Sequence, residues 1–230
     1  MKKLIVLTVC ICLGIPLVAL GQLPRVVFPP NPTPQELAAA FKKVSLGRRD
    51  LFQVLSAVHE RGDNAVAGLS ALLLNPGLGL DTSRSVRLCV LMSLEGICSP
   101  PAVAVLMQAA RSHRNAEVRG VALNTIATRY YEKVLNEQLT PSKEIVHLLM
   151  GYADDTTDVD YLHLSFGQIA RIGVQSWMGR DFGEPEEGEV KVNVGANEVV
   201  MTLKEYREFW WQRYGNRLRW NAQSGHFEMP

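Results

Sequence analysis

The chain has 230 residues, of which 47% are hydrophobic and 20% are charged, so it can form one packed domain with a small addition. Its formal net charge is +1. Without residues 1–21, which hold Lys2 and Lys3 and no acidic residue, it has 22 basic against 23 acidic residues, or −1. A protein this close to neutral lacks the basic surface that nucleic-acid binding requires, so we expect no nucleic-acid partner.

Residues 1–21 have the features of a bacterial signal peptide. Lys2 and Lys3 precede the apolar run LIVLTVCICLGI, and the tripeptide ALG offers small residues to a signal peptidase before Gln22. The alternative is an uncleaved anchor, but the apolar run is shorter than the ~20 residues that span a bilayer. We therefore expect cleavage before Gln22, a periplasmic or secreted protein, and no membrane span after cleavage.

Residues 22–34 hold five of the twelve prolines and predict an extended tether, because proline fixes φ and lacks an N–H donor. From residue 35 to residue 177 the apolar residues recur at helical spacing between short turn segments. Polar residues at the turns, namely Asp63, Asn115 and Asp158, are expected to cap helices, and Pro101 and Pro141 to lie in first turns. The expected helices are Gln35–Val44, Arg49–Arg61, Asn64–Asn75, Arg84–Ile97, Pro101–His113, Ala116–Asn136, Ser142–Tyr152 and Val159–Trp177.

An internal repeat lies within this helical region. The segments DTSRSVRLCVLMSLEGI and NAEVRGVALNTIA share a polar cap, a Val-Arg pair and small or apolar residues at helical spacing. The two pairs, Val86-Arg87 and Val118-Arg119, are 32 residues apart, and a shorter apolar helix precedes each. The segments EIVHLLMGYA and DVDYLHLSFGQIARIG form a third pair. Paired helices that recur in this way indicate stacked repeats.

Over residues 50–175 the chain resembles HEAT-repeat proteins, including short arrays that bacteria export. The resemblance implies an all-α fold, a short right-handed α-solenoid of helical hairpins over residues 35–177. It also implies a ladder in which an Asp in one turn pairs with an Arg of a neighbouring repeat. Asp81, Arg87 and Arg119 match that pattern, whereas His113 and Asp160 stand where the family has Asp and Arg.

Residues 178–230 differ in character. The acidic, glycine-rich stretch GRDFGEPEEGE predicts a loop, and VKVNV followed by EVVM predicts a small β-hairpin. Thr202 and Glu205 have the spacing of a capping box, and Gly215 is a helix stop. The helix between them carries one apolar stripe, which consists of Leu203, Tyr206, Trp210 and Tyr214 and is flanked by Phe209 and Trp211. We expect this aromatic helix to cap the stack, or alternatively an indole such as Trp211 or Trp220 to bind a ligand.

No motif of a reaction centre is present. The histidines do not form a metal-binding pair, and DDTTDVD lacks the Gly and Glu of a calcium loop. The RGD at residues 61–63 is read as a helix–helix turn. Cys89 and Cys98 are expected to be reduced and buried, because nine residues of one helix place them on opposite faces. We expect no catalytic residue, no cofactor and no metal.

The most unusual internal group consists of Arg129, Tyr130 and Tyr131, with Arg171 near the end of the last long helix. Arg and Tyr dominate binding hot spots, so these residues are candidates for a partner-binding surface, together with Trp211 and Trp220. The alternative is that the arginines pair with local acids such as Glu132 or Asp155.

The expected function is therefore that of a non-enzymatic exported scaffold that binds another protein in the cell envelope. The alternative is a glycan- or small-ligand-binding module that uses the aromatic C-terminal region. An enzyme of the phycobilin-lyase type, which is also built from HEAT repeats, is a further possibility, but an export signal argues against a cytosolic pigment pathway.

Overall fold

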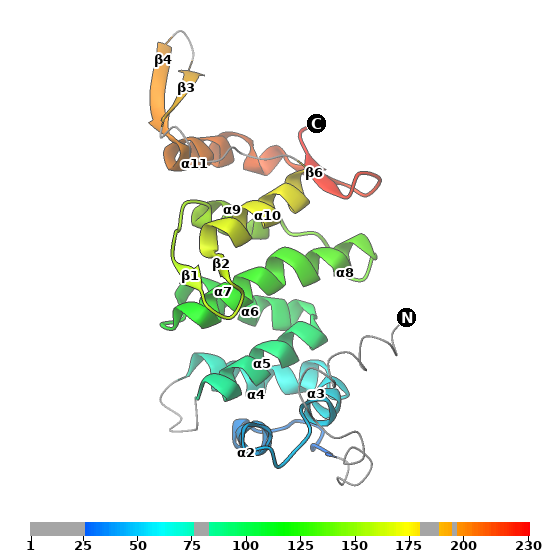
Figure 1. The fold of residues 1–230 in the computed structure, drawn as a ribbon. Helices are drawn as coiled ribbons and strands as arrows, with labels where there is room; N and C mark the ends of the chain where they lie inside the picture. The colour runs from blue at the N-terminus through cyan, green and yellow to red at the C-terminus, as the bar shows by residue number, and fades with distance from the viewer. Residues whose placement is uncertain (1–25, 76–82, 180–188, 195–196) are drawn as a thin grey trace.

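The structure is a computed structural model that describes residues 26–75, 83–179, 189–194 and 197–230. Over these ranges the chain is mostly helical, which confirms the expected all-α class, and its strands are short. Successive helices lie in layers one above another along a single axis, with the N-terminal helix at one end and the C-terminal segment at the other (Figure 1). The predicted signal peptide and the first residues of the predicted tether lie outside the described residues.

The described part of the predicted tether is packed against the first helices. Phe28 is only 5% exposed and belongs to the hydrophobic core. A Cβ atom on Gly68 would lie 2.5 Å from the carbonyl oxygen of Pro32, so this close approach of two backbones requires glycine. Thr33 then caps the first helix, because its hydroxyl accepts the N–H of Glu36 while the Glu36 carboxylate accepts the N–H of Thr33.

The layers are formed by helices that pair with their neighbours in sequence. Helix α4 packs on α5, α6 on α7, and α9 on α10, while α7 also contacts both α5 and α10. A π-helical turn, η3, continues α7 into α8. The bounds are α2 Pro34–Ser45, α3 Leu51–His59, α4 Asp63–Leu74, α5 Arg84–Ile97, α6 Pro100–Ser112, α7 Ala116–Thr125, η3 Ile126–Tyr130, α8 Tyr131–Leu135, α9 Lys143–Tyr152 and α10 Phe166–Met178.

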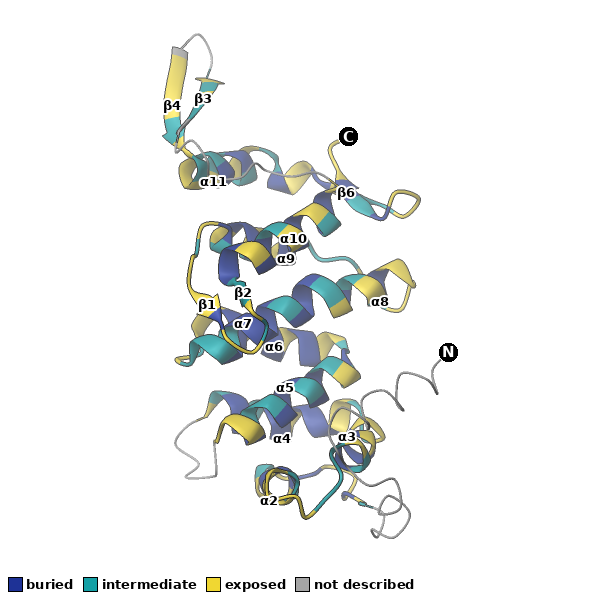
Figure 2. Ribbon diagram, viewed as in Figure 1, coloured by how far each residue is buried: buried dark blue, intermediate teal, exposed yellow. Residues whose placement is uncertain are grey.

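The core runs along the whole stack between these helices (Figure 2). Cys89 is buried within α5, and Cys98 is buried as the left-handed residue that ends the helix, with φ of 42°. Both thiols are free, which confirms the expected burial without a disulfide. The assignment of both to one helix needs correction, because α5 ends at Ile97.

The expected helix Val159–Trp177 is wrong at its start. Strand β1, Asp158–Val159, pairs with β2, Leu164–Ser165, and α10 begins only at Phe166. The helix cap is Ser165 and not Asp158, because the Ser165 hydroxyl accepts the N–H of Gln168 in a full capping box. Val159 is fully buried and packs directly on Gly120 of α7. The contact is so close that a Cβ atom on Gly120 would lie 2.2 Å from a methyl group of Val159.

The remaining predicted caps have mixed outcomes. The Asn115 side chain accepts the N–H of Val118, as expected of an N-cap. Asp63 is the first residue of α4 and not its cap, because Gly62 with φ of 55° makes the turn into the helix. Pro141 also lies outside a helical turn, since α9 begins after Ser142.

The C-terminal segment contains the predicted hairpin, the predicted helix and a second hairpin that was not predicted. The acidic loop before the first hairpin falls mostly on residues 180–188, outside the described residues. The capping box of Thr202 and Glu205 is confirmed, and Gly215 ends the helix. The bounds are β3 Glu189–Val194, β4 Asn197–Thr202, α11 Leu203–Tyr214, the 3-10 turn η5 Gly215–Arg217, β5 Arg219–Asn221 and β6 His226–Glu228.

Within the described ranges, none of the helices is both long enough and apolar enough to cross a bilayer.

Candidate functional site

The candidate site is centred on Arg129, which lies in the π-helical turn η3. A π-turn contains more residues than an α-turn, so it rotates the residues that follow it relative to the helix before it. Arg129 consequently points away from the core, with 56% of its side chain exposed, whereas Tyr130 is buried. On a regular α-helix Arg129 would continue the buried stripe of Val118, Ala122 and Thr125, and the π-turn is the reason that a charged residue can occupy this position.

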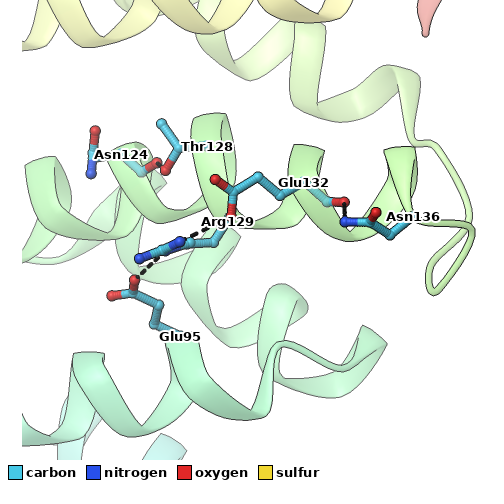
Figure 3. Close-up of polar contacts among 6 residues, drawn as sticks. All are labelled: Glu95, Asn124, Thr128, Arg129, Glu132 and Asn136. Carbon is cyan, nitrogen blue, oxygen red and sulfur yellow. Dashed lines mark hydrogen bonds and ion pairs between the residues drawn. The ribbon is translucent and has the colours of Figure 1, made fainter. Parts of the chain in front are cut away.

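Arg129 joins two helices through ion pairs (Figure 3). Its Nε donates to Glu95 in the last turn of α5 at 3.0 Å, and its Nη1 donates to Glu132 in α8 at 2.9 Å. The hydrogen bonds that Arg129 donates to Glu132 and, next in size, to Glu95 raise the pKa of Arg129 above its ordinary value. The expected alternative, that Arg129 pairs with a local acid, is therefore confirmed for Glu132. Asp155 instead accepts the N–H of Thr157.

Two further hydrogen bonds satisfy backbone carbonyls around the π-turn (Figure 3). The hydroxyl of Thr128 donates to the carbonyl of Asn124 at 2.8 Å, and the side-chain amide of Asn136 donates to the carbonyl of Glu132 at 2.8 Å. The carbonyl of Glu132 also accepts the backbone N–H of Asn136 at 3.1 Å, so the amide of Asn136 adds a second hydrogen bond at the end of α8. The Thr128 bond thus joins the π-turn to α7, whereas the Asn136 bond lies at the end of α8.

Arg129 and its two acids border a groove of about 350 Å³. Leu55, Met92, Gly96 and Lys133 complete its lining. The groove has an apolar floor from α3 and α5 and a charged rim of both signs from α5, η3 and α8. Lys133 is partly buried at the rim of the groove.

Gly96 keeps this groove open next to His59. A Cβ on Gly96 would lie 2.0 Å from two atoms of the His59 ring, so any side chain here would displace the imidazole. Partial burial lowers the pKa of His59 below its ordinary value, so the ring is neutral at pH 7. His59 adjoins Gly96 but is not one of the residues that line the groove.

The neighbouring tyrosines, Tyr130 and Tyr131, pack in the aromatic part of the core. The hydroxyl of Tyr130 donates to the carbonyl of Thr140 at 2.5 Å, and that of Tyr131 donates to the carbonyl of Gly225 at 3.2 Å. Both rings pack on Trp177, at centroid distances of 5.7 Å and 5.3 Å. These contacts join η3 and α8 to the C-terminal segment.

Arg171 lies in the middle of α10 and has a partner of its own. Its Nη1 donates to the carbonyl of Ala153, the residue that follows α9, at 2.9 Å, and Arg171 is half-buried. Arg129 binds Glu95 and Glu132, so the two arginines hold different segments of the stack.

The two candidate tryptophans also pack on other rings. Trp211 stacks on His147 with a centroid distance of 4.7 Å and an interplanar angle of 2°. Trp220 packs on Trp177 at 5.9 Å and on Phe227 at 5.3 Å. Trp177 is fully buried, so it forms the centre of an aromatic cluster that the unpredicted β5–β6 hairpin completes.

Adjacent layers are joined by ion pairs that sequence reasoning missed. Arg84 at the start of α5 binds Glu117 at the start of α7, and Glu95 at the end of α5 binds Arg129. The partners are 33 and 34 residues apart, close to the spacing of the sequence repeat, and this spacing was the available signal. Asp81 of the expected ladder lies outside the described residues, while Arg119 donates to the carbonyl of His113 at 2.8 Å.

The described residues contain no group of three or more His, Cys, Asp or Glu side chains that could hold a metal ion. Comparisons with protein-family models, with curated proteins and with solved structures find no match for this chain.

Proposed function

We propose that the chain is an exported helical-repeat scaffold of the HEAT type, without enzymatic activity, that binds another protein in the cell envelope. The observation that carries the proposal is the groove between α3, α5 and α8, where an apolar floor is bordered by ion-paired side chains. Grooves of this kind between helices suit an apolar side chain of a partner, and the polar rim orients it.

The arrangement of the layers supports the repeat assignment. Helices α5, α7 and α10 contact one another in order, and α4 and α6 contact each other beside them. The helices thus form two rows, and each layer contributes one helix to each row, as in stacked helical hairpins. The Val-Arg pair recurs at residues 86–87 and 118–119, close to the start of α5 and of α7. The repeat in the sequence therefore coincides with the repeated helix in the stack.

The charges of the groove favour a protein partner. Arginine is enriched at binding hot spots, and Arg129 is held in place by Glu95 and Glu132 before any partner arrives. Preorganised side chains lose little conformational entropy on binding. The partly buried Lys133 adds an ammonium that can donate to a carboxylate or carbonyl of the partner.

The glycan-binding alternative has less support. A sugar site needs an aromatic face that is open to solvent, whereas Trp210 is buried and Trp211 and Trp220 lie against His147 and Trp177. These contacts favour a structural role for the aromatic C-terminal region.

Replacing Met92 with Glu should abolish capture of the partner, because it places a carboxylate on the apolar floor beside Glu95. We expect affinity purification from the envelope fraction to recover a stoichiometric protein with the parent chain and at least ~10-fold less with this variant. Ile172→Glu is the matched control, since Ile172 is 49% exposed on α10 and does not line the groove. Equal loss in both variants, or retention of the partner by Met92→Glu, contradicts the groove assignment.

Export is tested by the N-terminus of the native protein. Edman sequencing of protein purified from the producing bacterium should begin at or near Gln22, because the small residues of ALG precede it. An intact Met1 in protein from the cytosolic fraction contradicts export.

A further inference from the structure

The β3–β4 hairpin stands apart from the helices. It extends beyond α11, away from the stack (Figure 1), and both of its strands contact that helix. Most of β4 is exposed (Figure 2), including Val199 at 36% and Val200 at 51%. A two-stranded hairpin is marginally stable in water by itself, and an exposed strand with apolar side chains is a template for another strand.

The hydrogen-bonding groups on the free edge of β4 can be identified from its register. Bonds in an antiparallel ladder alternate, so successive residues of β4 direct their N–H and C=O groups toward β3 and then away from it. The N–H of Thr202 donates to Glu205 and not to β3. Thr202, Val200 and Glu198 therefore form the set that points away from β3, and the N–H groups of Val200 and Glu198 are directed to solvent.

We propose that β4 pairs antiparallel with β4 of a second copy of this chain, about a two-fold axis at Val200. In this register Val200 lies opposite Val200 of the second copy, and Glu198 lies opposite Thr202. Val199 lies opposite Met201 on the other face. The pairing joins two hairpins into a four-stranded sheet in which apolar residues face apolar residues and no like charges are opposed.

The same pairing satisfies the edge of the strand. The two Val200 residues exchange both of their backbone bonds, and each Glu198 N–H donates to the carbonyl of Thr202 in the other copy. The Thr202 N–H is already bonded within its own chain, so no donor of this set is left unpaired. A two-fold axis also closes the assembly, so growth stops at the dimer.

The β3 edge is less suited to this role. Lys191 lies in the middle of β3, with 71% of its side chain exposed, and binds Glu198 at 3.0 Å. A lysine on an edge strand is a common means of preventing further pairing. A second copy therefore fits β4, whereas β3 is protected.

The test uses the natively processed protein and analytical ultracentrifugation over a wide concentration range. A few paired residues bury less than the ~1,000 Å² of a stable interface, so the parent should be a weak, concentration-dependent dimer. Val200→Lys and Val200→Glu each place like charges at the two-fold axis and should weaken self-association at least ~10-fold. An equimolar mixture of the two variants should associate again, because a lysine then lies opposite a glutamate.

Asn193→Lys is the control on the edge of β3 and should leave the dimer unchanged. The proposal is overturned if the parent stays a monomer, if Asn193→Lys dissociates the dimer while Val200→Lys does not, or if the mixture fails to associate. Capture of the envelope protein through the groove does not depend on residue 200, so the two proposals fail separately.

Discussion

Replacing Trp210 with Ala is expected to lower the free energy of unfolding by ~3–5 kcal/mol, the usual cost of truncating a buried indole. Trp210 is 6% exposed and belongs to the common core, where its ring lies 5.6 Å from that of Tyr214. Helix α11 packs on α9 at the end of the stack, so the indole covers an apolar surface that water would otherwise reach. Domains of ordinary stability have only ~5–15 kcal/mol, so thermal unfolding should show a large drop in Tm.

Trp211→Ala is the matched control, because it removes the neighbouring indole of the same helix. Trp211 is half-buried and stacks on His147, a contact worth ~0.5–1.5 kcal/mol beyond its buried area. We expect its Tm to fall clearly less than that of Trp210→Ala. A Trp210→Ala protein that melts like the parent would show that α11 is no structural cap.

Replacing Asp154 with Ala is expected to cost ~3–5 kcal/mol, because it leaves a buried guanidinium without its counter-ion. Asp154 follows α9 and pairs with Arg207 of α11, so this ion pair attaches the C-terminal helix to the stack. The Arg207 side chain is 4% exposed, whereas that of Asp154 is 36% exposed. Chemical denaturation of the variant measures the loss.

The two halves of this ion pair should have unequal effects. Arg207→Met leaves an aspartate that can turn to water, and the methionine fills part of the apolar space, so this variant should cost less than Asp154→Ala. The double variant should also be more stable than Asp154→Ala alone, because no unpaired charge remains buried. Equal losses for the two single variants, with no recovery in the double variant, contradict the assignment of Arg207 as a buried charge.

Helix α5 and the caps at Asn115 and Thr202 could be predicted from the sequence because their signals are local, whereas the caps expected at Asp63 and Asp158 were wrong. The expected bounds of α5, Arg84–Ile97, agree with the structure, and the capping box of Thr202 and Glu205 begins α11 as predicted. Apolar periodicity and side-chain caps act within a few residues, so they can be read without knowledge of the partner elements. The β3–β4 hairpin also has a local signal, because the alternating valines of VKVNV predict a strand.

The short strands had no such signal. Strands β1 and β2 have two residues each, and β5 and β6 have three, which is too few for alternation to be recognised. Val159 packs on Gly120 of α7. Trp220 is half-buried because its ring packs on that of Trp177. Both results depend on residues that are distant in the sequence.

For the candidate site, the sequence by itself identified Arg129, Tyr130 and Tyr131 as unusual and Glu132 as an available partner of the arginine. Only the tertiary structure separated their roles. The π-turn directs Arg129 to the groove and Tyr130 to the core, and Glu95 reaches Arg129 from the layer below. Residue type and helical spacing are properties of one segment, whereas a groove is the space between packed segments. Its lining was therefore decided by how α3, α5 and α8 come together.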